Sequence, residues 1–433
     1  MANHFYNRFR RHQFKVFQAI VLFACVLAIA CQSRSAQEST GNGQTVMFRA
    51  ELPLEARPAP RWQPNATGFL KPLSEDAPNS GFLPETLGFD EQLWGLDTQA
   101  DDRALLLQSI DYSLQYLASA KAAADYRGYP IPGITQERVV RSLERFRELV
   151  ETASTPQELQ LAVFEEFTFY QSVGTEGFGD VLFTAYFEPV YAASRVPTAE
   201  YRYPLYGKPP DLDSWPRPHP TRGELEGKDG LQGEKGPLKG LELFWLRDRL
   251  EAYLIHIQGS ARLELTDGTE TTVGYADNTR HDYTSIGAEL VEDGKLTLEE
   301  AKMPAIEAYF ENDPPELDVY IPRDRSFVFF QENFGTPALG NLQVPVTASR
   351  SIATDDTLMP PGALALIHTD VPFANPSGAM EERRVSRYVL NQDTGGAIRG
   401  PGRVDYFLGA GPVAGDRAGL MVSEGKLFFL LLK

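Results

Sequence analysis

Apolar side chains recur at helical spacing in the first third of the chain. Leucine and isoleucine residues between 105 and 117 repeat every three or four positions, directly after Asp101 and Asp102, which can cap a helix start. A second apolar set between 139 and 150 has the same spacing. The run Thr155-Pro156-Gln157-Glu158 forms a capping box with proline at the first helical position. Three helices are therefore predicted here.

The pattern changes to that of strands from Gly179 onward. Residues 181–187 are rich in β-branched and aromatic side chains, and the run is broken by Pro189. Residues 243–265 return to a strand pattern. The intervening segment 204–240 carries many prolines and glycines, which predicts a long excursion on the surface.

The last part of the chain has the pattern of a small barrel. Thr297 and Glu300 form another capping box, before a short helical stretch that ends at Phe310. Residues 326–433 consist of short apolar runs divided by glycine and proline turns, which is typical of a small β-barrel. We therefore expect an α+β fold that is largely β, with helices first and two β-rich parts after them.

The first 31 residues have the pattern of a bacterial lipoprotein signal. A basic head without acidic residues precedes an apolar run from Val16 to Ala30, which is short for a membrane span. Small residues stand directly before Cys31, so we expect cleavage before Cys31 and lipid on its thiol. Gln32 then indicates the outer membrane, with the protein facing the periplasm. An ordinary secretory signal and an uncleaved anchor remain alternatives.

Composition narrows the range of functions. The 433 residues are 42% hydrophobic and 23% charged, which is enough for two or three domains. A net charge of −18 argues against nucleic-acid binding, because a phosphate backbone requires a basic face. Of the two cysteines, Cys25 lies inside the signal, and the histidines form no HxH or HExxH pair. Neither a metal nor another cofactor is therefore expected.

The remaining candidates for chemistry are carboxylates in unusual settings. Asp393 precedes the pair Gly395-Gly396, where the backbone is expected to need positive φ or a close approach. Asp405 lies within the strand-like run 404–408, where aspartate is disfavoured. An acid there is an outward-facing strand residue, part of a bulge, or a buried carboxylate with a raised pKa.

These residues resemble a known family. Asp355, Asp393 and Asp405, each in its local sequence, resemble the three aspartates of the 3D domain. Three further segments resemble, in the same order, motifs of the membrane-bound lytic murein transglycosylase A family: residues 183–189, 257–263 and 278–287.

The resemblance implies a fold and an activity. The fold is a double-psi β-barrel with N-terminal helices, joined to a second small β-barrel, with glycan bound in the groove between them. The activity is that of a peptidoglycan exotransglycosylase of the lyase class, which cuts the β-1,4 bond between N-acetylmuramic acid and N-acetylglucosamine and leaves a 1,6-anhydromuramoyl end. The expected parts are a signal peptide (1–30), a tether (31–83), the helical part of domain 1 (84–180), domain 2 (181–325) and the 3D domain that completes domain 1 (326–433).

In the family, the catalytic aspartate stands at the position of Asp405. A single acid is chemically sufficient, because the C6 hydroxyl of the sugar itself can replace water as the nucleophile. Asp405 would protonate the leaving oxygen and then accept the hydroxyl proton, which requires a raised pKa. We expect Asp393 to support this acid rather than to transfer protons.

Strand periodicity and the resemblance together select the residues expected to bind sugar. In a strand, Thr184 and Tyr186 share one face, and so do Gln258 and Ser260. The resemblance adds Tyr283. A solvated outer face is the alternative interpretation of these polar positions. The expected partners are peptidoglycan glycan strands, together with a membrane through the N-terminal lipid.

Two other functions remain open. One is a non-catalytic, envelope-tethered lipoprotein that binds glycan. The other is a hydrolase that uses Asp393 and Asp405 as two carboxylates and leaves a reducing end instead of an anhydro end. Glu188 is a further candidate for a second carboxylate.

Overall fold

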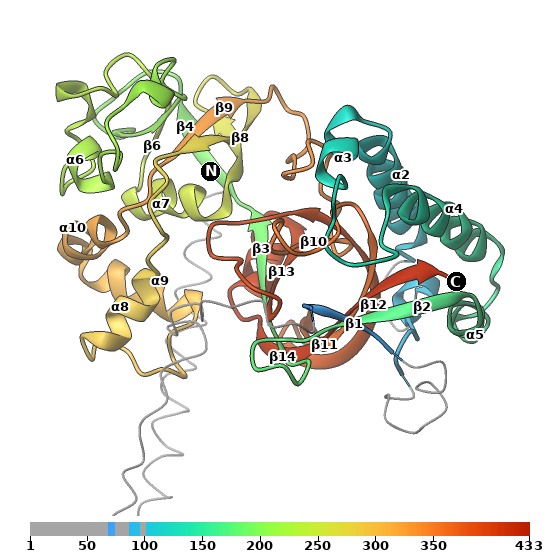
Figure 1. The fold of residues 1–433 in the computed structure, drawn as a ribbon. Helices are drawn as coiled ribbons and strands as arrows, with labels where there is room; N and C mark the ends of the chain where they lie inside the picture. The colour runs from blue at the N-terminus through green and yellow to red at the C-terminus, as the bar shows by residue number, and fades with distance from the viewer. Residues whose placement is uncertain (1–67, 74–85, 96–100) are drawn as a thin grey trace, which may run out of the picture. The chain divides into compact units, whose positions relative to one another are not determined.

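The computed structural model describes residues 68–73, 86–95 and 101–433 (Figure 1). The predicted signal peptide and Cys31 lie outside these residues. Within the described part of the chain, every helix is too short or too polar to cross a bilayer.

A closed six-stranded barrel is the main element of the described structure. It belongs to a sheet with these strands: β1 (Leu70–Pro72), β2 (Phe167–Ser172), β3 (Val181–Glu188), β10 (Ser351–Ala353), β11 (Leu364–Ala374), β12 (Met380–Asp393), β13 (Arg403–Ala410) and β14 (Val422–Leu432). The order around the ring is β3, β13, β10, β12, β11 and β14, and β14 pairs with β3 to close it. The β3–β13 and β10–β12 pairs are parallel, whereas the other pairs in the ring are antiparallel.

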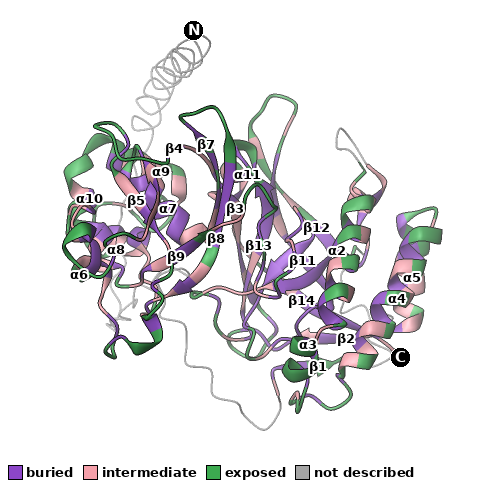
Figure 2. Cartoon of the chain, turned by 90° about the horizontal axis from the view of Figure 1, so that it is seen from above, coloured by how far each residue is buried: buried purple, intermediate pink, exposed green. Residues whose placement is uncertain are grey.

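The N-terminal helices cover one side of this sheet (Figure 1). The three predicted helices are α2 (Arg103–Leu117), α4 (Gln136–Thr152) and α5 (Pro156–Glu166), and the structure adds the short α3 (Ala120–Asp125) and the 3-10 turn η3 (Glu91–Trp94). The apolar stripe of α4 is buried as its spacing predicts, and the ring of Phe146 lies 4.8 Å from that of Tyr388 on β12. Figure 2 shows the same burial along the barrel strands and the inner helix faces.

Residues 70–72 depart from the predicted tether. They form β1, which pairs with β2 and extends the sheet beyond β14. The reason is apolar burial, since Phe69 and Leu70 are both buried in the barrel core.

A second sheet is formed by β5 (Tyr203–Tyr206), β6 (Glu242–Leu246), β4 (Val190–Ser194), β7 (Ser260–Leu265), β8 (Glu270–Asn278) and β9 (Val328–Glu332), in that order. A single bridge between Gly207 and Phe330 joins its two edges, so the sheet curls back on itself. Phe244, Ile255 and Leu263 lie in its core. The prediction of a largely β α+β fold is confirmed.

The predicted strand pattern over 243–265 is wrong in its middle. Residues 249–258 form a helix, α7 (Arg249–Gln258), between β6 and β7. Asp248 caps its start by accepting hydrogen bonds from the backbone N–H groups of Leu250 and Glu251, and Gly259 ends it with a φ of 76°. Apolar residues on nearly every side of this buried helix conceal its helical spacing.

The segment 204–240 is not a surface excursion. It contains α6 (Arg222–Glu226) and the 3-10 turns η4 (Leu212–Ser214) and η5 (Gly233–Lys235). Leu212, Leu225 and Leu238 are fully buried, and they form a separate small core with Phe327 and Phe329. The prolines and glycines of this segment therefore shape a packed structure.

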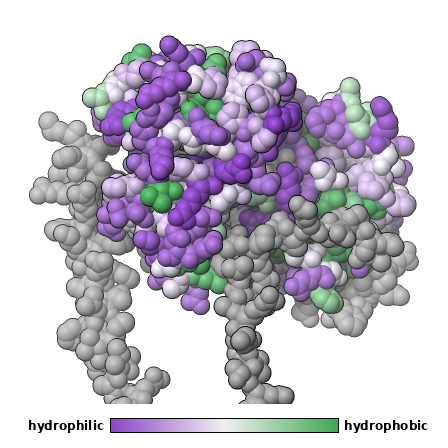
Figure 3. All heavy atoms as spheres, turned by 60° about the vertical axis from the view of Figure 1, so that its left-hand side comes forward, coloured by the Kyte–Doolittle hydropathy of each residue, from purple (hydrophilic) through white to green (hydrophobic). Residues whose placement is uncertain are grey.

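Short helices complete the second part: α8 (Ile286–Glu292), α9 (Met303–Asn312), η6 (Pro314–Glu316), α10 (Leu317–Tyr320) and η7 (Ile321–Arg323). The carboxylate of Glu300 accepts hydrogen bonds from the backbone N–H and the hydroxyl of Thr297, which is one half of the predicted capping box, but α9 begins only at Met303. Pro304 fixes this start, because proline is tolerated in the first turn of a helix. Figure 3 shows that the face turned forward there is mainly hydrophilic.

Two domain boundaries differ from the predicted ones. β3 pairs with β13 and β14, so residues 181–188 belong to the barrel and not to the second domain. β9 pairs with β8, so residues 328–332 belong to the second sheet and not to the 3D part. Strand character was visible in the sequence at both places, but the pairing partners lie far away along the chain and cannot be derived from it. A last helix, α11 (Pro412–Ala418), packs on β3 and β13.

A buried charge cluster joins the N-terminal helices to the barrel. The fully buried guanidinium group of Arg350 lies 2.5 Å from carboxylate oxygens of both Asp90 and Asp102. It also donates to the carbonyl oxygen of Tyr388, and Arg387 forms a second ion pair with Asp102. Buried charges require such complete pairing, because an unpaired one is costly.

Replacing Arg350 with Met should therefore leave the buried carboxylate of Asp90 without a cation, and Asp102 with Arg387 alone. We expect the free energy of unfolding to fall by roughly 3–5 kcal/mol, measured by urea denaturation. The matched control is Arg384→Met, because Arg384 is half exposed in its pair with Asp370, and a change of at most about 1 kcal/mol is expected there. Equal losses in the two variants would contradict the assigned role of the cluster.

Candidate active site

Asp405 lies on β13 beside Thr184 on β3. The two residues are register partners in the parallel pair, and the hydroxyl of Thr184 donates to Asp405 Oδ1 over 2.7 Å. The side chain of Asp405 is half-buried, whereas its neighbours Val404 and Tyr406 point into the barrel core. Strand alternation thus places the acid on the opposite face from the core.

Ala353 separates Asp405 from Asp393. On β10, it is the register partner of Asp405 on one side and of Asp393 on the other. Because neighbouring strands lie about 4.8 Å apart, the Cα atoms of the two aspartates are separated by about 10 Å. The small side chain of Ala353 is buried between them.

Asp393 is held by three hydrogen bonds. The hydroxyl of Tyr186 donates to its Oδ2 over 2.8 Å, and the backbone N–H groups of Asn341 and Thr394 donate to its Oδ1. The ring of Tyr186 packs against Phe407, with 5.1 Å between ring centroids. Tyr186 therefore reaches from β3 across β13 and β10 to the acid on β12.

Both aspartates have raised pKa values. Burial raises the pKa of Asp405, and the charge of Arg403 and the hydrogen bond from Thr184 oppose this only in part. Burial also raises the pKa of Asp393 to about 6, against its hydrogen bonds and with a contribution from the charge of Asp405. A carboxyl group in this setting can retain its proton near neutral pH and act as a general acid.

Gln258 and Ser260 lie where the second sheet meets β3. Gln258 is the last residue of α7, and its Oε1 accepts a hydrogen bond from the backbone N–H of Phe187 over 2.9 Å. Ser260 begins β7 and pairs with Gly274 on β8. The predicted shared strand face of Gln258 and Ser260 is wrong, because a helix end and Gly259 separate them.

Tyr283 has a different environment from the other predicted site residues. It lies in the turn before α8, and its neighbour Thr284 donates a backbone hydrogen bond to the buried carboxylate of Asp324. Tyr253 donates to the same carboxylate, and burial, together with the nearby Asp324 and Tyr283, raises the pKa of Tyr253. These contacts place Tyr283 among the helices of the second domain.

Glu188 and Asp355 have structural partners. Glu188 is buried and forms an ion pair with Arg262 on β7, at 2.8 Å. Asp355 accepts hydrogen bonds from Thr357 and from the backbone N–H of Gly400 over 2.7 Å. Asp355 thus ties the loop after Asp393 to the turn after β10.

The expectation of a positive φ or a close approach is wrong for Gly396, where a Cβ atom would have nothing within 4 Å, whereas Gly395 shows a close approach, since a Cβ atom there would lie 3.1 Å from the side chain of Ile398. Neither glycine has a positive φ. The positive φ of this loop lies at Gly400, at 81°. The left-handed backbone of this loop therefore lies at Gly400, where Asp355 holds the loop, and not beside Asp393.

Sequence reasoning missed Ala353 and Asn341. Ala353 has no polar group, and its role depends on strand pairing that the sequence does not reveal. The sequence feature that could have pointed to Asn341 is the glycine before it. A Cβ atom at Gly340 would lie 2.5 Å from the carbonyl oxygen of Gln392, so only glycine fits there. This close approach brings the backbone N–H of Asn341 to Asp393.

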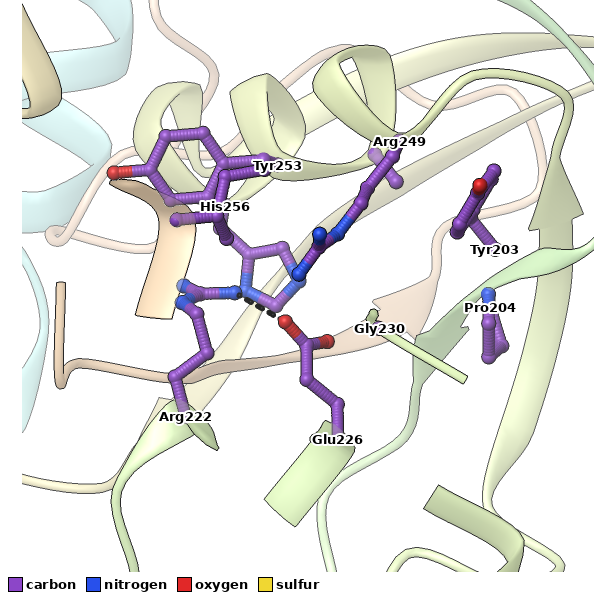
Figure 4. A pocket seen from close by; sticks show the side chains of 10 residues that line it. Tyr203, Pro204, Arg222, Glu226, Gly230, Arg249, Tyr253 and His256 are labelled. Carbon is purple, nitrogen blue, oxygen red and sulfur yellow. Dashed lines mark hydrogen bonds and ion pairs between the residues drawn. The ribbon is translucent and has the colours of Figure 1, made fainter. Parts of the chain in front are cut away.

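A second polar cavity lies inside the second domain (Figure 4). Arg222, Glu226, Arg249 and His256 line a space of about 20 Å³. This volume suffices for one water molecule and not for a sugar ring. Within the described residues, there is no cluster of three or more His, Cys, Asp or Glu side chains that could hold a metal ion.

Comparison with known proteins identifies both β-rich parts. Residues 182–331 match the family model described as the MltA specific insert domain, and residues 350–431 match the 3D domain. The membrane-bound lytic murein transglycosylase A of Escherichia coli K12 is 30% identical over 263 residues, which are 60% of this chain and 68% of that protein. The protein of the same name from Vibrio cholerae is 31% identical over 257 residues, 59% of this chain and 66% of that protein.

Solved structures share the fold. The membrane-bound lytic murein transglycosylase from Agrobacterium tumefaciens has a TM-score of 0.61 at 27% identity, and the match covers 78% of this chain and 94% of that one. Escherichia coli MltA with bound chitohexaose has a TM-score of 0.63 at 24% identity, covering 84% and 94%. Because a relative that is 30% identical is matched over more than two thirds of its length, the chain belongs to the membrane-bound lytic murein transglycosylase A family.

Proposed function

We propose that this chain cleaves the β-1,4 bond between N-acetylmuramic acid and N-acetylglucosamine in peptidoglycan without using water. The observation that carries the proposal is the half-buried Asp405, whose pKa is raised by burial and whose carboxylate accepts a hydrogen bond from Thr184. Membership of a family named for murein transglycosylation supports the substrate.

In the proposed reaction, Asp405 acts first as an acid and then as a base. Its proton passes to the glycosidic oxygen as the bond from that oxygen to C1 of the muramic acid breaks. The C6 hydroxyl of the same sugar attacks C1, a C1–O6 bond forms, and the hydroxyl proton returns to Asp405. The carboxyl group ends in its starting state, so no other proton donor is required.

Asp393 is proposed as a positioning residue. Three hydrogen bonds direct its carboxylate toward Tyr186 and the loop of Asn341, which leaves it poorly placed to move a proton. Its negative charge, when present, disfavours ionisation of the nearby Asp405 and so helps the acid to keep its proton.

The proposed glycan groove lies between Asp405 and the start of the second sheet. Thr184 and Tyr186 border it on the barrel, and Gln258 and Ser260 border it on the other side. Sugar binding by a relative supports this, since Escherichia coli MltA has been solved with chitohexaose. Tyr283, which the resemblance also selects, is proposed as a further sugar contact from the turn before α8.

A hydrolase that uses both aspartates is the second candidate. It is favoured by the pKa of Asp393, raised to about 6, which leaves part of this group ionised and able to activate water at neutral pH. The two reactions differ in product, because hydrolysis leaves a reducing end.

The Asp405→Asn variant tests the acid. Asparagine keeps the shape of the side chain and can hydrogen-bond to Thr184, but it cannot protonate the glycosidic oxygen. We expect release of anhydro-ended fragments from murein to fall by about 10³–10⁴-fold, measured by mass spectrometry, with an unchanged melting temperature.

Two matched variants complete this experiment. Asp111→Asn makes the same charge change at an exposed position on α2 and should keep full activity. Asp393→Asn should retain more activity than Asp405→Asn. If Asp405→Asn remains active while Asp393→Asn does not, the acid has been assigned to the wrong residue. Reducing ends in the products would support the hydrolase.

The pH profile tests the coupling between the two acids. Since Asp405 must be protonated, kcat/KM should fall as the pH rises through its raised pKa. Removing the neighbouring negative charge in Asp393→Asn lowers the pKa of Asp405, so the alkaline limb of the profile should move to lower pH. An alkaline limb at the same pH in both proteins would show that Asp393 does not act on the acid.

We also propose that the chain is a lipoprotein of the outer membrane that faces the periplasm. Cys31 lies outside the described residues, and the proposal rests on the residues before it and on the membrane-bound relatives. Changing Cys31 to Ser should move the protein from the membrane pellet to the soluble fraction. Retention of a processed Cys31→Ser protein in the pellet would contradict lipidation.

A further inference from the structure

Phe334 combines two unfavourable properties. Its side chain is 80% exposed, although aromatic side chains gain most when they are buried. Its φ is 52°, in the left-handed region, which costs a bulky residue on the order of 1–2 kcal/mol. Strain of this kind persists where the surrounding structure enforces it, often at ligand sites.

Phe334 occupies the second position of a tight turn. The backbone N–H of Thr336 donates to the carbonyl oxygen of Asn333 over 3.0 Å, and Gly335 follows Phe334 with a φ of 81°. Two consecutive positive φ angles are the signature of a type I′ turn, in which asparagine, aspartate or glycine normally stands at this position. Local turn chemistry therefore does not explain the phenylalanine.

The turn is fixed rigidly to β8 by Thr272. The carbonyl oxygen of Thr272 accepts from the N–H of Asn333 over 2.8 Å, and its hydroxyl accepts from the N–H of Gly335 over 3.1 Å. The same hydroxyl donates to the carbonyl oxygen of Thr336 over 3.0 Å. The exposed ring is thus carried on a backbone that is held on both sides.

The turn adjoins the border of the proposed groove. The side-chain nitrogen Nδ2 of Asn333 lies 2.4 Å from the place that a Cβ atom of Gly274 would occupy. Gly274 is in turn the register partner of Ser260. From the turn, the chain runs on to Asn341, which donates to Asp393. Phe334 therefore lies between β9, which ends at Glu332, and Asn341, which contacts Asp393.

We propose that Phe334 is a sugar-binding platform of the glycan groove, remote from the cleaved bond. Pyranose rings of N-acetylated sugars present apolar C–H faces, which pack against an aromatic ring, and a rigid ring loses little conformational entropy on binding. The platform would bind a sugar unit of the glycan that lies several sugar units away from the one at Asp405. This inference rests on the proposed function, because it takes glycan as the ligand.

The experiment measures binding of chitohexaose and of chitobiose by calorimetry. The Phe334→Gly variant removes the ring and relieves the strain, whereas Phe334→Trp keeps a platform. The matched control is Phe178→Ala, because Phe178 is 78% exposed in the loop between β2 and β3.

For Phe334→Gly, we expect the Kd of chitohexaose to rise roughly three- to tenfold, as loss of an aromatic contact implies. Its melting temperature should not fall, because glycine adopts a positive φ without strain. Phe334→Trp and Phe178→Ala should bind chitohexaose as the parent does. The affinity for chitobiose should be equal in all four proteins, because the proposed platform binds only a unit of a longer glycan.

Three results would overturn the inference. One is an unchanged Kd of chitohexaose in Phe334→Gly, and another is an equal loss of chitobiose binding, which would indicate general damage. The third is a parent protein that does not bind chitohexaose. Failure of the proposed function is recognised separately, by anhydro-ended fragments released by Asp405→Asn, and that result leaves the binding comparison intact.

Discussion

The structure depends on one buried guanidinium group. Arg350 stands directly before β10, the short strand that carries Ala353 between the two acids, and its charge is neutralised by Asp90 and Asp102 from the N-terminal segments. A three-residue strand has few hydrogen bonds of its own with which to fix its register. The ion cluster supplies that fixation, so the helical region positions the site although it contributes no residue to it.

The site has a cost in stability that follows from its chemistry. An aspartate whose pKa is higher in the folded than in the unfolded protein favours folding less once the pH exceeds its unfolded value. For Asp393, whose pKa is raised to about 6, this loss develops between its ordinary value of 3.8 and about pH 6. At neutral pH the fold therefore tolerates two acids that it would hold more easily in protonated form, and the buried core beneath them offsets the loss.

Capping residues and apolar spacing predicted the N-terminal helices correctly. They could not predict structure that depends on contacts with residues far away along the chain. The capping threonine of α5 and the apolar spacing of α4 were sufficient, because a helix satisfies most of its hydrogen bonds within itself. The helix α7 was hidden because burial on nearly all sides removes the polar positions that reveal a helical period. The conjunction of Thr184, Asp405 and Asp393 arises from pairing across more than two hundred residues, and only the family resemblance pointed to it. The family resemblance did not predict that Ala353 lies between the two aspartates.

The insertion of the second sheet into the barrel has a consequence for how the chain folds. All strands of the second sheet come from one continuous stretch, residues 190–332, whereas β3 must pair with β13 and β14, whose residues are synthesised more than two hundred positions later. Such non-local pairing is slow, because a long loop must close before any contact forms. As the chain is synthesised from its N-terminus, the second sheet can therefore be complete while β3 still presents unpaired edges. The row that joins Thr184, Asp405 and Asp393 can form only after the last strands of the barrel have been made.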